Sequence, residues 1–216
     1  MNLNNYIEHT LLKPDTTTAQ VKALCQEAID HNFAAVCVPP FYVKPAAQYL
    51  EDTPIKIVTV VGFPMGYSAI PTKVEETKRA VDEGADEVDM VVNIAAIKDG
   101  NWSHVKNDID SVTTAVHLKG KAIKVILEMG LLSAAELKQL CTICEEVGVN
   151  YVKTSTGINA GGATVEMVKL LKGNIKSNIK IKASGGIKTR VFAQQLIQAG
   201  ADRIGTSAGI AIANEA

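Results

Sequence analysis

The chain has 216 residues, of which 47% are hydrophobic and 21% are charged, as in folded globular proteins. Its 22 basic and 23 acidic residues nearly cancel, so no overall field attracts nucleic acid or an anionic membrane surface. Residues 1–6 lack the basic and apolar regions of a signal peptide, and no apolar run approaches the roughly 18 residues of a membrane span. We therefore expect a cytoplasmic protein with no nucleic-acid or membrane partner.

Four cysteines, Cys25, Cys37, Cys141 and Cys144, lie in apolar stretches of the sequence. We expect packed free thiols and no disulfide framework. Cys141 and Cys144 form a C-x-x-C, but they fall inside a predicted helix without a second Cys or His pair, which disfavours a metal or redox site.

The predicted elements alternate between strands and helices. A short strand over residues 7–14 is stopped by Pro14, and a helix capped by residues 15–18 runs to about residue 30. In chain order we then predict strand 34–38, helix 45–50, strand 56–62, helix 71–83, strand 87–93, helix 102–118, strand 122–128 and helix 133–147. The remaining predictions are a strand entering a loop over 151–157, helix 164–171, a strand and loop over 179–186, helix 189–199, strand 203–207 and a short helix over 209–214.

The joints between helices and strands follow a repeated design. Residues 83–86, 147–150 and 199–202 each combine a glycine helix stop, a small apolar residue and a polar residue. Eight strands separated by helices or turns are typical of a closed parallel barrel. We therefore predict an α/β protein with a single-domain (β/α)8 TIM barrel over residues 1–216, and a doubly wound open sheet is the alternative.

Two lysines lie in the middle of apolar strands, Lys153 within residues 151–157 and Lys182 within residues 179–186. A lysine is rarely buried, and desolvation lowers the pKa of a buried ammonium toward that of a nucleophilic amine. A second ammonium nearby lowers such a pKa further. Lys153 is therefore a candidate for forming a Schiff base, with Lys182 as its neighbour, although a single strand lysine is more often an end residue that reaches solvent.

Acidic and basic residues recur on one face of four predicted strands. Alternate residues of a barrel strand point to the interior, which places Asp89, Lys124, Glu128, Lys153 and Lys182 there. Because buried charges persist only when they are paired, we predict that these five residues form one interior network.

Two glycine-rich loops follow the last two predicted strands. Gly185 and Gly186 end one strand, and residues 205–209 follow the other. Barrels often hold a phosphate group at this position, with backbone N–H groups and a helix N-terminus. We predict a phosphate site here, to which Gly157 of the preceding loop contributes.

Five stretches together closely resemble the deoxyribose-phosphate aldolases, a family of class I aldolases on a (β/α)8 barrel. They are residues 7–14 (IEHTLLKP), 87–93 (EVDMVVN), 151–157 (YVKTSTG), 181–187 (IKASGGI) and 203–207 (RIGTS). The resemblance implies reversible cleavage of 2-deoxy-D-ribose 5-phosphate to D-glyceraldehyde 3-phosphate and acetaldehyde, in deoxyribonucleotide catabolism. It implies a sugar-phosphate substrate, no metal or other cofactor, and a homodimer.

The resemblance also implies roles for individual residues. Lys153 would be the Schiff-base lysine, Lys182 its neighbouring ammonium, and Asp89 the acid and base that works with Lys182 and a water. The matching phosphate-binding positions are Gly157, Gly185, Gly186, Gly205 and Ser207.

The sequence departs from the family pattern at several positions. Glu8 replaces the usual aspartate, which puts a relay role there in doubt, and Ile158 replaces a common aromatic or basic residue. Ala208 stands where a second serine is usual and so removes a hydroxyl near the phosphate. Met129 and Gly130 replace the residue pair that usually follows the position of Glu128. The sequence ends at Ala216 without the tail that carries a tyrosine in some members. We expect these changes to affect phosphate affinity or proton transfer and to leave Schiff-base chemistry intact.

Three other functions are weighed against this one. The first is another Schiff-base aldolase or a transaldolase, and the second is a non-catalytic sugar-phosphate binder, which intact Lys153, Lys182 and Asp89 disfavour. The third is a metal-dependent aldolase, which is disfavoured because the four histidines are scattered along the sequence.

Overall fold

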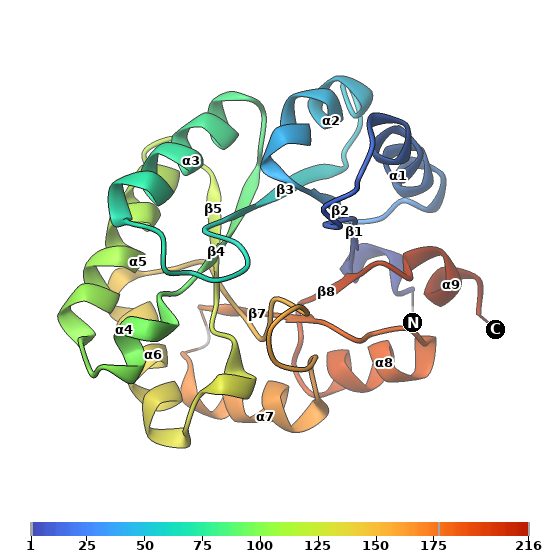
Figure 1. Cartoon of the computed structure of the whole chain (residues 1–216). Helices are drawn as coiled ribbons and strands as arrows, with labels where there is room; N and C mark the ends of the chain where they lie inside the picture. Colours follow the sequence, from blue (N-terminus) through green and yellow to red (C-terminus); the bar gives the residue numbers. More distant parts are fainter. Residues whose placement is uncertain (1, 177, 216) are drawn as a thin grey trace.

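The computed structural model describes residues 2–176 and 178–215 of the chain. Within these residues, parallel strands pair in sequence order from β1 to β8, and β8 pairs with β1 to close a barrel (Figure 1). The strands are β1 (Ile7–Thr10), β2 (Ala35–Val38), β3 (Lys56–Val61), β4 (Glu87–Val91), β5 (Ala122–Ile126), β6 (Tyr151–Lys153), β7 (Lys180–Ser184) and β8 (Arg203–Thr206). The predicted (β/α)8 barrel is confirmed, and the alternative of an open sheet is wrong.

Helices surround the barrel, as Figure 1 shows. They are α1 (Thr18–His31), α2 (Val43–Tyr49), α3 (Ile70–Asp82), α4 (Ile94–Lys98), α5 (Trp102–His117), α6 (Ala134–Val147), α7 (Val165–Asn174), α8 (Arg190–Gln198) and α9 (Gly209–Asn214), with 3-10 turns η1 (Asn4–Tyr6), η2 (Pro40–Tyr42) and η3 (Met129–Leu131). A capping box of Ser133 and Glu136 begins α6. In the part of the chain that the structure describes, no helix combines the length and hydrophobicity needed to cross a bilayer.

Several strands end earlier than predicted because polar residues begin the next element. β4 ends at Val91, and Asn93 instead caps the unpredicted helix α4 by accepting a hydrogen bond from the Ala96 N–H at 3.1 Å. β5 ends at Ile126, and Glu128 takes a left-handed backbone conformation with φ 53°. These early ends decide which polar side chains reach the barrel interior.

The interior of the barrel is divided into an apolar and a charged part. Ala35 and Cys37 of β2 pack with Val58 and Val60 of β3 in a separate apolar cluster. The ionisable side chains that contact one another inside the barrel come from β1, β4, β5, β6 and β7 instead. The charged groups are therefore gathered on one side of the barrel.

Candidate active site

Lys153 and Lys182 lie next to each other because they are register partners on the neighbouring strands β6 and β7. Both side chains are buried. Their amines donate to the same carboxylate oxygen, Oδ2 of Asp89, at 2.8 Å from Lys153 Nζ and 2.7 Å from Lys182 Nζ. The structure thus brings together the three residues that the sequence suggested for catalysis.

Further buried charges extend this cluster. Lys124 Nζ lies 2.5 Å from Glu87 Oε2, 3.1 Å from Asp89 Oδ1 and 3.5 Å from Glu8 Oε1. Glu8 also pairs with Lys182. We call these six residues the charge network: Glu8, Glu87, Asp89, Lys124, Lys153 and Lys182.

The charge network sets the ionisation of its members. Burial alone would raise the pKa of Asp89, but Lys124, Lys153 and Lys182 hold it well below its usual range. Burial would likewise lower the pKa of Lys124 and of Lys182, but the carboxylates of Asp89 and Glu8 raise both above the usual value. Asp89 is therefore an anion, and Lys124 and Lys182 are cations, near neutral pH.

A cavity of about 290 Å³ opens at the carboxyl ends of the strands, where barrel enzymes place their sites. Of the three lysines in the charge network, Lys153 is the one that borders it. The cavity is also lined by all five residues suggested for phosphate binding: Gly157, Gly185, Gly186, Gly205 and Ser207. The amine of Lys153 and the glycine-rich loops thus face the same space.

The structure corrects the predicted membership of the network at Glu128. This carboxylate lies beyond the end of β5 and accepts hydrogen bonds from Thr156 and Asn159, so the prediction that it joins the lysines is wrong. Ile126, not Glu128, is the register partner of Lys153. The left-handed backbone at Glu128 breaks the strand alternation on which that prediction depended.

Two acids of the network were missed. Glu87 lies two residues before Asp89 and hence on the same face of β4, so strand alternation alone was a sufficient signal. Glu8 was treated as a doubtful substitute for an aspartate, yet it is fully buried and pairs with Lys182. The longer side chain of Glu8 therefore still reaches the lysines.

Other candidate groups lie apart from the cavity. His9 Nε2 lies 2.7 Å from Glu27 Oε2 of α1. Cys141 and Cys144 are free and buried in α6, and burial raises the pKa of Cys141 to about 12. Among residues 2–176 and 178–215, no group of three or more His, Cys, Asp or Glu side chains is arranged to hold a metal ion.

A closed (β/α)8 barrel with a lysine amine bordering its cavity has the design of an enzyme that works through a covalent amine. The sequence matches the DeoC/LacD family aldolase profile over residues 6–215. The chain therefore belongs to the DeoC/LacD family of aldolases.

Individual relatives agree with this assignment. The chain is 48% identical over 212 residues to a deoxyribose-phosphate aldolase of Brevibacillus brevis, a match that covers 98% of this chain and 95% of the relative. The structure of a putative deoxyribose-phosphate aldolase from Coccidioides immitis is similar, with a TM-score of 0.95 and 40% identity over 99% of this chain and 85% of that one. A tetrameric deoxyribose phosphate aldolase from Aeropyrum pernix has a TM-score of 0.91 and 30% identity, with coverage of 98% and 89%.

The ionisation of Glu87 leads to a prediction about stability. Burial would raise the pKa of Glu87, but Lys124 and Lys56 outweigh burial and lower it to about 2. In the unfolded chain this carboxyl titrates near about pH 4.3, so its stabilisation is complete above that pH and is lost as the pH falls toward the folded value. Glu87→Gln removes this titration. Between about pH 5 and 2, the free energy of unfolding should fall less steeply in the variant, by up to about 1.4 kcal/mol per pH unit.

Urea unfolding at a series of pH values, followed by the fluorescence of the single tryptophan, Trp102, measures these slopes. The exposed carboxylate of Glu166 provides a control, since Glu166→Gln should keep the wild-type slope. Equal slopes for wild type and Glu87→Gln would contradict the prediction.

Proposed function

We propose that the chain is a class I aldolase that reversibly cleaves 2-deoxy-D-ribose 5-phosphate to D-glyceraldehyde 3-phosphate and acetaldehyde. The observation that carries the proposal is the shared oxygen of Asp89, which holds Lys153 at the cavity and a second, cationic lysine beside it. The names of the relatives support the choice of substrate. Lys153 is the proposed nucleophile.

In the proposed mechanism, the neutral amine of Lys153 attacks the C1 aldehyde, and loss of water gives a protonated imine. A base takes the proton of the C3 hydroxyl, the C2–C3 bond breaks, and its electron pair passes to the imine, so that an enamine forms in place of a carbanion. Glyceraldehyde 3-phosphate leaves. Protonation of the enamine carbon and hydrolysis of the imine then release acetaldehyde and restore Lys153.

Asp89 and Lys182 are the proposed proton-transfer groups. Asp89 accepts from both amines, so it lies one hydrogen bond from the nitrogen at which the imine forms. Lys182 Nζ donates to the same oxygen, so a cationic lysine lies beside that nitrogen. Asp89, Lys182 and a water would thus exchange protons with the C3 hydroxyl and the enamine carbon.

The proposal predicts that acetaldehyde and sodium borohydride will leave an ethyl group on Lys153. Peptide mass spectrometry locates the adduct, which should disappear in Lys153→Ala and diminish in Lys182→Ala, because the second variant loses a proposed proton-transfer group bound to Asp89. Lys180→Ala, at the exposed start of β7, should label as the wild type does. Labelling spread over surface lysines, with none at Lys153, would refute the proposed function and favour a sugar-phosphate binder.

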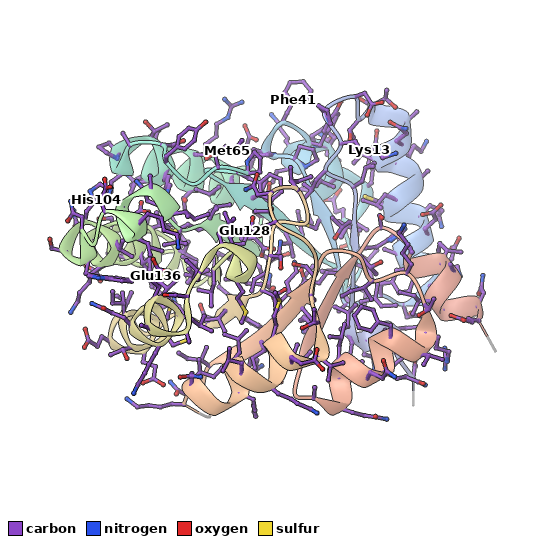
Figure 2. All side chains as sticks on the ribbon, turned by 60° about the horizontal axis from the view of Figure 1, so that its bottom comes forward. Lys13, Phe41, Met65, His104, Glu128 and Glu136 are labelled. Atoms are coloured by element: carbon purple, nitrogen blue, oxygen red, sulfur yellow. The ribbon has the colours of Figure 1, made fainter. Side chains whose placement is uncertain are left out.

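We also propose that the phosphate group binds at the loops after β6, β7 and β8. Gly185 has φ 91°, and a Cβ there would lie 3.1 Å from the Cα of Gly157, so glycine keeps these two loops in contact beside the cavity. Lys13 and Lys188 line the cavity and are exposed. Figure 2 shows Lys13 on the outer part of the molecule. Two lysine cations there would complement a phosphate dianion.

Lys188→Ala should therefore raise the KM for 2-deoxyribose 5-phosphate by about tenfold, the equivalent of about 1.4 kcal/mol. The KM for 2-deoxyribose, which has no phosphate, should change far less. Steady-state kinetics with both sugars makes the comparison, and Lys169→Ala on the outer helix α7 is the control. An equal effect on both sugars would contradict a phosphate role.

We propose a homodimer, built on a groove of about 730 Å³ that is lined by residues of η2 and α3, including Pro40, Phe41 and Pro71. Phe41 is 76% exposed and protrudes at the upper edge of the molecule in Figure 2. A protruding apolar side chain beside a groove suits a self-complementary two-fold contact.

Sedimentation of the full chain should then give about twice the chain mass of 23.0 kDa. Phe41→Glu should shift the protein toward the monomer, because it places a charge in the contact. A wild-type monomer at micromolar concentration would refute the homodimer.

We propose further that the barrel acts as a single catalytic domain in the cytoplasm. A phosphate dianion does not cross a bilayer unaided, so a sugar-phosphate enzyme is expected where its substrate is phosphorylated. Cell fractionation tests this location.

A further inference from the structure

Glu128 is a fully buried carboxylate that lies outside the charge network. Its Oε1 accepts a hydrogen bond from the Thr156 N–H at 3.1 Å. Its Oε2 accepts from the Thr156 hydroxyl at 2.5 Å and from the Asn159 side-chain amide at 3.1 Å. Both oxygens are thus occupied by neutral donors from one loop, the segment 156–159 after β6.

The groups that donate hydrogen bonds to Glu128 also fix the conformation of the segment 156–159. The Thr156 hydroxyl oxygen accepts from the N–H groups of Ile158 at 3.1 Å and Asn159 at 3.3 Å, which closes a tight turn around Gly157. The Asn159 amide also donates to the carbonyl oxygen of Pro64, at 2.8 Å. Glu128 therefore joins three loops, those that follow β3, β5 and β6.

The position of Glu128 ties this loop to the Lys153 strand. The residues on either side of Glu128 donate backbone hydrogen bonds to β6 and its continuation, from Leu127 to the Lys153 carbonyl at 2.9 Å and from Met129 to the Thr154 carbonyl at 3.0 Å. Thr156, Gly157 and Ile158 line the cavity, but Glu128 does not. In Figure 2, Glu128 lies well inside the outline of the molecule.

The backbone conformation at Glu128 indicates that a carboxylate side chain is needed at this position. With φ 53° and ψ 55°, it takes a left-handed conformation that residues with a Cβ rarely adopt. Glycine would suit that backbone better but would leave the N–H and hydroxyl of the buried Thr156 without their acceptor. Strained residues that are held by their surroundings cluster at functional sites.

We propose that Glu128 is a positioning residue that holds the segment 156–159 over the cavity for the phosphorylated substrate. It acts by fixing Thr156, so that Gly157 lies against Gly185 and Ile158 closes the side of the cavity beside Lys153. Glu128 takes no proton in the reaction, because it contacts none of the lysines and its oxygens are occupied. The inference rests on the proposed function, since it concerns binding of the sugar phosphate at the same cavity.

The test compares binding of the large substrate with imine formation by a small one in Glu128→Gln. A glutamine amide cannot accept from all three donors, so at least one hydrogen bond to the loop is lost. The KM for 2-deoxyribose 5-phosphate should rise by about tenfold, which corresponds to one lost hydrogen bond to a charged group. Borohydride trapping of acetaldehyde on Lys153 should stay within about twofold of the wild type, since acetaldehyde is too small to need the loop.

Glu166→Gln is the matched control, because it removes an exposed carboxylate from the start of α7 and should leave both measurements unchanged. Asn159→Ala is a second variant at an exposed position, which keeps the test valid if Glu128→Gln folds poorly. It should raise the KM in the same direction. In the double variant, the KM should rise by less than the product of the two separate effects, because both residues act through one hydrogen-bonded unit.

An unchanged KM in Glu128→Gln and in Asn159→Ala would overturn the inference. Loss of trapping at Lys153 in well-folded Glu128→Gln would overturn it as well, since Glu128 would then act on the amine and not on the loop. Failure of the proposed function is a separate result, because the wild-type protein itself would then not trap acetaldehyde on Lys153.

Discussion

One carboxylate oxygen, Oδ2 of Asp89, accepts hydrogen bonds from two lysine amines inside the barrel. An unpaired ammonium at such a depth would be strongly disfavoured, and two of them without an anion would repel each other. The anion of Asp89 offsets both the cost of burial and the repulsion. Its other oxygen, Oδ1, lies 3.1 Å from Lys124 Nζ. Asp89 contacts all three lysines of the charge network, so their burial depends on it more than on Glu8 or Glu87.

The barrel provides the geometry that this interaction needs. Parallel strands in register place Lys153 beside Lys182 and Asp89 beside Lys124. The outward faces of the same strands are apolar and pack against helices, as with Val88 and Met90 of β4. In β4, β5, β6 and β7, alternate residues therefore belong either to the apolar core or to the charge network.

Much of this arrangement is accessible from the sequence, because alternation and glycine helix stops are local signals. These local signals are enough to predict the eight strands of the barrel and the common inward direction of Lys153, Lys182 and Asp89. The end of a strand is less predictable, since the left-handed backbone at Glu128 depends on partners in a loop about 30 residues away in sequence. The role of Glu8 likewise depends on a contact with β7, near the other end of the chain.

The charge network also reaches the opposite, amino-terminal end of the barrel. Lys56, at the start of β3, has a half-exposed side chain whose amine donates to Glu87 at 2.7 Å, and Glu87 in turn contacts Lys124. A row of ionisable side chains, Lys56, Glu87, Lys124 and Asp89, therefore runs through the barrel from solvent to the amine of Lys153. The electrostatic potential at that amine therefore also depends on Lys56, which does not line the cavity. A substitution of Lys56, or salt that screens it, would change this potential and leave the residues around the cavity unchanged.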